Sequence, residues 1–460
     1  VLRRRLRTLI SIPHGRRSPT WLQPQRPMDS QKQSRLELPH VTGLRMATMN
    51  QSDSYYRRGL GLKAQVKPVL QAEYGSELVQ AMKASDHQLK VGRLTFRMAK
   101  SLGFCYGVDR AVEYAYETCS KFPDRRICLV GEIIHNPLVN RQLESMGVIF
   151  LYPDAEGEFD FAPVESSDVV ILPAFGVAID AFETLRDIGC VLVDTTCGSV
   201  LHVWKRVESY ARDGFTALIH GKYRHEETRA TSSQVLKHEG GSFLVVRDMD
   251  ELGLVCGFIR GSVPAEAVRT AFAGKTSEGF DPEVHLARIG VANQTTMLAT
   301  ESLEIARVVG EAIRDRWGDE ELQERFRSFD TICSATQDRQ DAVLDLMQDD
   351  PDMMLVIGWY NSSNTTNLAN ICSDRVRTYH IETDRSIDPA SGRISHKAVG
   401  TGAIVEEANW LPLEGELEIG LTAGASTPDS LIGRTIERIL LSLGEDPALV
   451  LAEALAATPE

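Results

Sequence analysis

One unit recurs along most of this 460-residue chain: a short apolar run rich in β-branched residues, a loop of small polar residues, and an amphipathic helix. The run and the start of its loop are clear at residues 168–176 (DVVILPAFG), 189–199 (GCVLVDTTCGS) and 352–358 (DMMLVIG). Strands that alternate with helices of about 10–15 residues are typical of βα units with a largely parallel sheet. The pattern therefore predicts an α/β fold over most of the chain.

Three cysteines occupy equivalent places in this pattern. Cys105, Cys197 and Cys333 each follow an apolar run, in the loop before a predicted helix. Parallel sheets place their binding and catalytic groups at the carboxyl ends of the strands. The recurrence indicates three α/β lobes, each presenting one cysteine to a common centre. Other polar side chains stand at strand ends in the same way: His225, Ser362, Asn364 and Ser426.

A set of three thiolates can hold a soft metal. A zinc ion and a [4Fe-4S] cluster both fit three cysteines, and spacing alone does not separate them. Ligand softness disfavours magnesium and calcium. Three protein ligands, unlike four, leave one coordination position open to a substrate. We expect the other five cysteines to serve packing or to lie at the surface: Cys119, Cys128, Cys190, Cys256 and Cys372.

The loops also contain groups suited to an anion and to proton transfer. His225 and Glu227 lie two residues apart in RHEE, which differs from the HExxH motif of zinc proteases. Hydroxyl and amide side chains open predicted helices at residues 361–367 (NSSNTTN) and 422–430 (TAGASTPDS). Each string alone is typical of a helix N-cap, but several helix starts in one place would bind phosphate through free N–H groups. The nucleotide motifs GxxxxGK[ST] and GxGxxG are not found.

Charge and hydropathy exclude several classes of protein. A formal net charge of −14 argues against a general nucleic-acid binder. The longest unbroken apolar stretch, residues 169–179, is shorter than the roughly 18 residues that a membrane span needs. Eight scattered cysteines do not resemble a secreted disulfide framework. We therefore expect a cytoplasmic protein with reduced thiols, without a membrane span and without a nucleic-acid partner.

The predicted organisation has six segments. Residues 1–28 hold seven arginines and no acidic residue. We therefore interpret residues 1–52 as a disordered extension or a targeting leader. If they are a targeting leader, a plastid location is the alternative to the cytoplasm. The remaining boundaries are a helical appendage at 53–94, three α/β lobes at 95–197, 198–333 and 334–445, and a C-terminal tail at 446–460.

Eight ordered motifs resemble one enzyme family, the 4-hydroxy-3-methylbut-2-enyl diphosphate reductases of the non-mevalonate isoprenoid route. The resemblance covers roughly residues 50–440 and is closest to the cyanobacterial and plant branch. It rests on GFCYGVDRAV, EIIHNPLVN, DTTCGS, HGKYRHEET, NQTTM, ICSATQDRQDAV, NSSNTTNLA and TAGASTPDSLI.

The resemblance implies a trefoil of three pseudo-symmetric α/β lobes around a [4Fe-4S] cluster. The cluster ligands would be Cys105, Cys197 and Cys333. Glu227 would deliver protons, with the Thr295 hydroxyl beside it. The substrate diphosphate would be bound by seven side chains: His135, His225, Thr296, Ser362, Ser363, Asn364 and Ser426.

The implied reaction removes an allylic hydroxyl reductively and yields isopentenyl and dimethylallyl diphosphate. Ferredoxin or flavodoxin is the electron donor that the resemblance implies. The alternative is a non-catalytic iron–sulfur sensor or anion-binding protein on the same scaffold, which would have no use for a Glu227–Thr295 pair. A zinc hydrolase acting on phosphorylated substrates is a further alternative.

Two positions depart from the family pattern. Phe175 stands where many members have a third histidine facing the diphosphate, and Lys222 or Arg224 are candidates to compensate for its charge. Gly198 stands where a proline commonly follows the middle cysteine. Since proline fixes φ and glycine does not, we expect a slightly less rigid ligand loop there.

Overall fold

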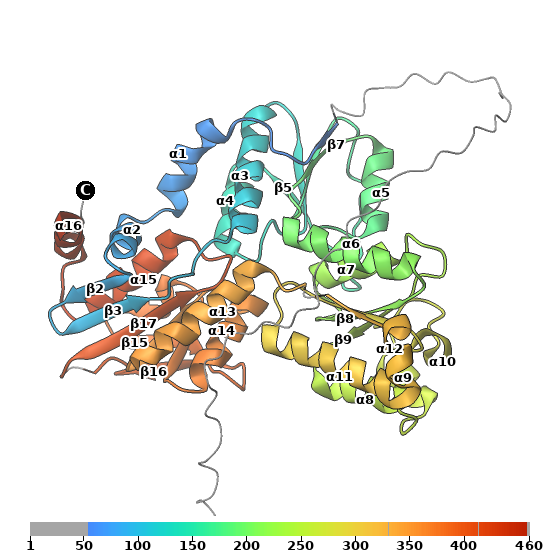
Figure 1. The fold of residues 1–460 in the computed structure, drawn as a ribbon. Helices are drawn as coiled ribbons and strands as arrows, with labels where there is room; N and C mark the ends of the chain where they lie inside the picture. The colour runs from blue at the N-terminus through green and yellow to red at the C-terminus, as the bar shows by residue number, and fades with distance from the viewer. Residues whose placement is uncertain (1–53, 330, 413, 458–460) are drawn as a thin grey trace, which may run out of the picture. The chain divides into compact units, whose positions relative to one another are not determined.

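The computed structural model describes residues 54–457, except residues 330 and 413. The described residues all lie in the second of the two units of the chain, Asn50–Glu460. The predicted leader at residues 1–52 lies outside the described residues. Figure 1 shows the second unit as helices packed against three separate sheets.

The first sheet is entirely parallel, in the order β1-β7-β6-β4-β5. Alternate residues of its strands pack into two cores, one under α3 and α4 and the other under α5. Burial on both faces explains why β4, β6 and β7 are apolar along most of their length. The strands are β1 (Tyr55–Tyr56), β4 (Ile127–Val130), β5 (Ile149–Leu151), β6 (Val169–Leu172) and β7 (Val191–Asp194).

The second sheet has four parallel strands in the order β11-β10-β8-β9. Helices α8, α9 and α11 cover one face, and α6 covers the other. The strands are β8 (Thr216–His220), β9 (Phe243–Val246), β10 (Ile289–Asn293) and β11 (Phe326–Ser328).

The third sheet is mixed. Its central strands β13, β12, β17 and β3 are mutually parallel, and antiparallel strands flank them on both sides. The strands are β2 (Gln88–Val91), β3 (Leu94–Met98), β12 (Met353–Ile357), β13 (Thr378–Ile381), β14 (Ile387–Asp388), β15 (Arg393–Lys397), β16 (Ile404–Ala408) and β17 (Leu417–Ala423). Three α/β lobes with short, mostly parallel sheets are therefore present, which confirms the predicted fold class.

The predicted start of the first lobe at residue 95 does not coincide with a sheet boundary. Strand β3 pairs with β17, with Met98 opposite Leu421, and therefore belongs to the third sheet. The predicted appendage is also divided: β1 joins the first sheet, whereas β2 joins the third. These boundaries differ from the sheets because β3 pairs with β17, a strand more than 300 residues later in the chain. No local sequence pattern specifies such a pairing.

Sixteen α-helices connect and cover the sheets in the described part of the chain. Helix α1 packs against α3, while α2 packs against α15 and α16. The helices are α1 (Lys63–Tyr74), α2 (Glu77–Ala84), α3 (Tyr106–Lys121), α4 (Pro137–Ser145), α5 (Ile179–Ile188), α6 (Gly198–Arg212), α7 (Glu226–Val235), α8 (Met249–Ile259), α9 (Ala265–Ala271), α10 (Pro282–His285), α11 (Ala299–Trp317), α12 (Asp319–Arg325), α13 (Ser334–Leu346), α14 (Ser363–Ser373), α15 (Asp429–Ser442) and α16 (Pro447–Ala457).

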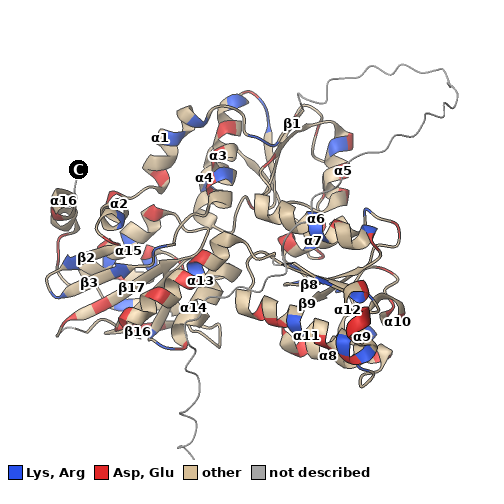
Figure 2. Ribbon diagram, viewed as in Figure 1, with Lys and Arg blue, Asp and Glu red and all other residues tan. Residues whose placement is uncertain are grey.

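Charged residues of both signs share the same outer helices. Figure 2 shows acidic and basic residues close together on α11 and α12. On α11, Arg307 pairs with Glu304 and Glu311. Among the described residues, no helix combines the length and the apolar character needed to cross a membrane.

Candidate active site

The three predicted metal ligands occupy equivalent backbone positions. Cys105, Cys197 and Cys333 are the N-cap residues of α3, α6 and α13, and all three have extended backbone angles. The strands that precede them, β3, β7 and β11, belong to three different sheets. Helix N-termini favour negative charge, so each lobe offers its sulfur at a position that stabilises a thiolate.

The thiols converge around the first turn of α3. A Cβ atom added at Gly107 would collide with Sγ of Cys197 and would lie 4.0 Å from Sγ of Cys105. The third thiol, Cys333, accepts the Thr336 N–H at 3.3 Å. Burial raises the pKa of Cys333 to about 11 and also raises the pKa of Cys105. Cys105 and Cys333 therefore need a cation beside them to ionise at neutral pH.

A buried carboxylate lies on the second-lobe side of the site. The carboxylate of Glu227, in the first turn of α7, accepts the Thr295 N–H at 2.6 Å and the Thr295 hydroxyl at 3.0 Å. Burial raises the pKa of Glu227 to about 7, although the two hydrogen bonds oppose this shift. Since the most effective proton-transfer groups have pKa values near the working pH, this carboxyl is suited to general acid–base catalysis.

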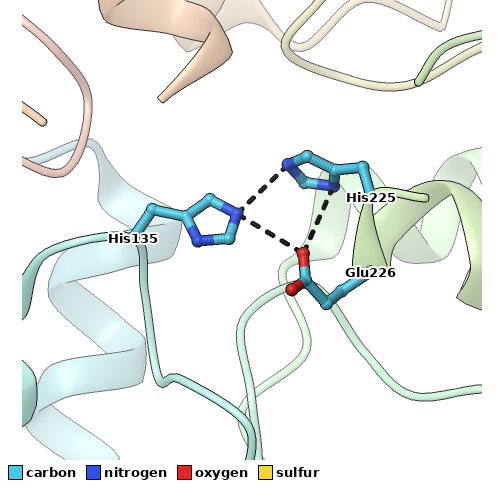
Figure 3. Close-up of side chains that lie close together, drawn as sticks. All are labelled: His135, His225 and Glu226. Carbon is cyan, nitrogen blue, oxygen red and sulfur yellow. Dashed lines mark hydrogen bonds and ion pairs between the residues drawn. The ribbon is translucent and has the colours of Figure 1, made fainter. Parts of the chain in front are cut away.

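Two histidines face each other across the first and second lobes. The Nε2 atoms of His135 and His225 lie 3.1 Å apart, and Glu226 Oε2 lies 3.7 Å from Nε2 of His135 (Figure 3). Nδ1 of His225 caps α7 by accepting the Glu227 N–H at 3.2 Å. The neutral ring of His225 therefore carries its proton on Nε2, where it can donate to His135 or to an anion. Burial lowers the pKa of His225 well below its ordinary value.

This histidine pair and Glu226 come close enough together to suggest a metal site. The tautomer argues against it. Because Nδ1 of His225 accepts a backbone N–H and Nε2 carries the proton, this ring has no free lone pair for a metal ion. The geometry is suited to binding an anion through N–H donors instead.

Polar groups from the third lobe complete the site. Ser362 caps α14, Asn364 Oδ1 accepts the Ala425 N–H at 3.0 Å, and Ser426 donates to the His135 carbonyl at 3.1 Å. Oγ of Ser363 and Nδ2 of Asn364 are among the buried side-chain atoms that have no hydrogen-bond partner in the described part of the chain, and both residues line this site. Buried polar atoms are nearly always paired, so these two donors indicate a ligand.

All twelve predicted site residues line one cavity, which we call the central cavity. They come from loops of all three lobes and include both unpartnered donors. The twelve are Cys105, His135, Cys197, His225, Glu227, Thr295, Thr296, Cys333, Ser362, Ser363, Asn364 and Ser426. Neither Lys222 nor Arg224 lines this cavity; Arg224 lines a neighbouring one. In the described part of the chain, no lysine or arginine lines the central cavity, so neither candidate takes the place of the histidine that is absent at Phe175.

The sequence comparison decides the family. The family model described as LytB protein matches residues 96–440. The chain belongs to the LytB family.

Two cyanobacterial LytB relatives are both named 4-hydroxy-3-methylbut-2-enyl diphosphate reductase. The protein of Synechococcus sp. (strain RCC307) is 46% identical over 85% of this chain and 95% of its own length. The protein of Gloeothece citriformis (strain PCC 7424) is 44% identical over 85% of this chain and 96% of its own length. A solved structure, the E-1-hydroxy-2-methyl-but-2-enyl-4-diphosphate reductase from Plasmodium falciparum, shares the fold at 20% identity, with a TM-score of 0.53 over 75% of this chain and 87% of that chain.

Sequence reasoning missed one charged residue of this LytB site. Arg339 lies on α13 and is 3% exposed, with its guanidinium donating to the Gly103 carbonyl at 2.6 Å. Burial lowers its pKa, while the nearby Cys105 and Cys333 oppose that shift. The available signal was the arginine within the ICSATQDRQDAV motif, six residues after the cysteine. Arg339 places a positive charge behind two of the thiols.

Proposed function

We propose that this chain is a 4-hydroxy-3-methylbut-2-enyl diphosphate reductase, which converts its substrate to isopentenyl and dimethylallyl diphosphate by reductive loss of the allylic hydroxyl. One observation carries the proposal: three capping thiols, a buried Glu–Thr pair and an anion-binding wall share the central cavity. The names of the LytB relatives support it. A sensor would not need a hydrogen-bonded carboxyl group directed at the same cavity.

The donor chemistry of the central cavity fits a [4Fe-4S] cluster. Cys105, Cys197 and Cys333 are soft ligands, and the helix N-termini together with Arg339 offset the negative charge of thiolates and cluster. Three cysteines would hold the cluster and leave one iron without a protein ligand. When bound, the cluster would supply electrons and an open Lewis-acid position for the substrate hydroxyl.

The side chains of the chain perform the remaining work. Removing a hydroxyl as water and protonating the allylic carbon consume two protons and two electrons. Glu227 holds a proton in a dry environment, and the Thr295 hydroxyl forms a path for it toward the cavity. His225 Nε2–H, Asn364 Nδ2 and the Ser363 hydroxyl are oriented to pair with a diphosphate, whose burial without donors would be very costly.

We propose ferredoxin or flavodoxin as the electron donor and the cytoplasm as the location. The cyanobacterial relatives support the location. A plastid location remains the alternative, and it depends on residues 1–52, which lie outside the described residues.

An anaerobic assay tests the proposed function. The purified protein, reduced with methyl viologen, is expected to convert the substrate to both isomeric products, and it should be brown and contain iron and sulfide. A brown protein that binds the substrate without turnover would support the sensor. A colourless, zinc-containing protein that releases phosphate would support the hydrolase.

Gly107 provides a test of the cluster site that does not depend on turnover. In Gly107→Ala, the added methyl group would collide with Sγ of Cys197, and we expect the folded protein to lose most of its iron. Gly198→Ala is the matched control, since an added Cβ there meets no atom within 4 Å. Iron and sulfide analysis, with circular dichroism to check folding, measures both. Equal iron content in the two variants would contradict the placement of Cys197.

A further inference from the structure

The His135 imidazole is held between two side chains of the first lobe. Its ring stacks on the ring of Phe175 with the centroids 4.2 Å apart and the planes 24° apart. At the edge of the same ring, Nδ1 of His135 lies 3.1 Å from a carboxylate oxygen of Glu132. Phe175 also makes an edge-to-face contact with His225, at a centroid distance of 5.6 Å and an angle of 84° between the planes. One phenyl ring thus touches both histidines of the proposed diphosphate site.

The backbone that presents Phe175 is fixed. The Gly176 N–H closes a turn on the Pro173 carbonyl at 3.0 Å, and Ala174 is bonded through its backbone to Ile133 and to Cys197. Gly176 has φ +76°, and a Cβ there would collide with the Trp204 ring. The backbone at Phe175 is therefore held by the loop after β6, which is hydrogen-bonded to the backbone of Cys197.

Phe175 also forms a wall. Beside the central cavity lies a second, largely apolar cavity at the carboxyl ends of β4 and β6, which we call the outer cleft. Among the described residues, His135 and Phe175 are the two that line both cavities. The outer cleft carries charged side chains of both signs, and one of its acidic groups, Glu158, is paired with Arg229. The His135–Phe175 stack therefore forms the boundary between the central cavity and the outer cleft.

We propose that Phe175 is a positioning residue for the diphosphate site. Its ring fixes the plane of His135 and closes the central cavity toward the outer cleft, so that the anion meets the histidine pair in one geometry and without water. Aromatic stacking is stronger than contact with an aliphatic side chain of similar size. The phenyl ring makes no polar contact with the anion in place of the absent third histidine. It instead orients the two histidines that are present. The inference rests on the proposed function, because it assumes that these histidines bind the substrate diphosphate.

The test compares three variants of the cluster-loaded enzyme. Phe175→Leu removes the aromatic face, Phe175→Tyr keeps it, and Phe159→Leu makes the same change at a residue that lines only the outer cleft. For Phe175→Leu we expect KM, and the Kd for inorganic diphosphate measured by calorimetry, to rise about tenfold, or about 1.4 kcal/mol. We expect kcat to stay within about twofold. The other two variants should match the unmodified enzyme in KM, Kd and kcat within about twofold.

Three binding results would overturn the inference: an unchanged Kd in Phe175→Leu, an equal loss of affinity in Phe175→Tyr, or an equal loss of affinity in Phe159→Leu. Loss of the cluster in Phe175→Leu would also overturn it, since it would show a structural role. Failure of the proposed function is distinguishable, because it would abolish turnover in the unmodified enzyme. The calorimetric comparison with inorganic diphosphate would still separate the variants in that case.

Discussion

Cys197→Ser is expected to lose most of its iron and to lower turnover by more than about 100-fold. Cys197 caps α6 in the loop between the first and second lobes, and its sulfur lies against the first turn of α3 beside that of Cys105. A serine hydroxyl is a harder and less acidic donor than a thiol, so it should not hold iron in place of the thiolate. Loss of residues that only support a metal ligand typically costs 10–100-fold, and loss of the ligand itself should exceed that range.

Cys119→Ser is the control for this prediction. Cys119 is a half-buried free cysteine on α3 that packs in the first-lobe core and does not line the central cavity. It should keep its iron, its sulfide and its turnover. Iron and sulfide analysis and the anaerobic assay on both variants test whether Cys197 is a cluster ligand. Near-normal turnover in Cys197→Ser would refute this assignment.

Glu227→Gln is expected to keep the cluster and to bind the substrate, but to lower kcat by about 10²- to 10⁴-fold. This range is the usual contribution of a general acid or base. The amide oxygen can still accept the Thr295 N–H, and the Thr295 hydroxyl can turn to accept from the amide nitrogen, so the local packing is preserved. What the variant lacks is a proton that it can transfer.

Glu227→Asp provides a graded comparison. It keeps the carboxyl group but shortens the side chain, so it should retain more activity than the glutamine variant while losing one of the two contacts with Thr295. Single-turnover measurements at saturating substrate isolate the effect on kcat from any effect on binding. An unaltered kcat in Glu227→Gln would remove Glu227 from the proton path.

The sequence predicted the site better than it predicted the connections between the lobes. Cysteines and polar side chains at strand ends are local features, and the fold brings the twelve predicted site residues to one cavity because parallel strands end at the same edge of each sheet. The pairing of β3 with β17 is different: Met98 and Leu421 lie opposite each other although they stand near opposite ends of the chain. The sequence of a short apolar strand does not indicate which other strand it pairs with in a sheet.

The missed residues share a physical reason. Arg339 and Gly107 lie on helices. An arginine on a helix usually faces solvent, and the sequence around a helical glycine does not show what packs against it. Their importance depends on contacts between lobes: Arg339 reaches the Gly103 carbonyl, and Gly107 leaves room for Sγ of Cys197. Phe175 is a similar case, since the sequence shows only that a histidine is absent, whereas the stack on His135 depends on the assembled loops.

The measurement that tests the account most directly is an anomalous difference map at the iron absorption edge from crystals grown without oxygen. We predict one compact group of iron peaks in the central cavity, bonded to Cys105, Cys197 and Cys333, with one iron that no side chain binds. A single zinc peak, or iron held by other residues, would contradict the claim that one sulfur from each lobe meets at a common cluster.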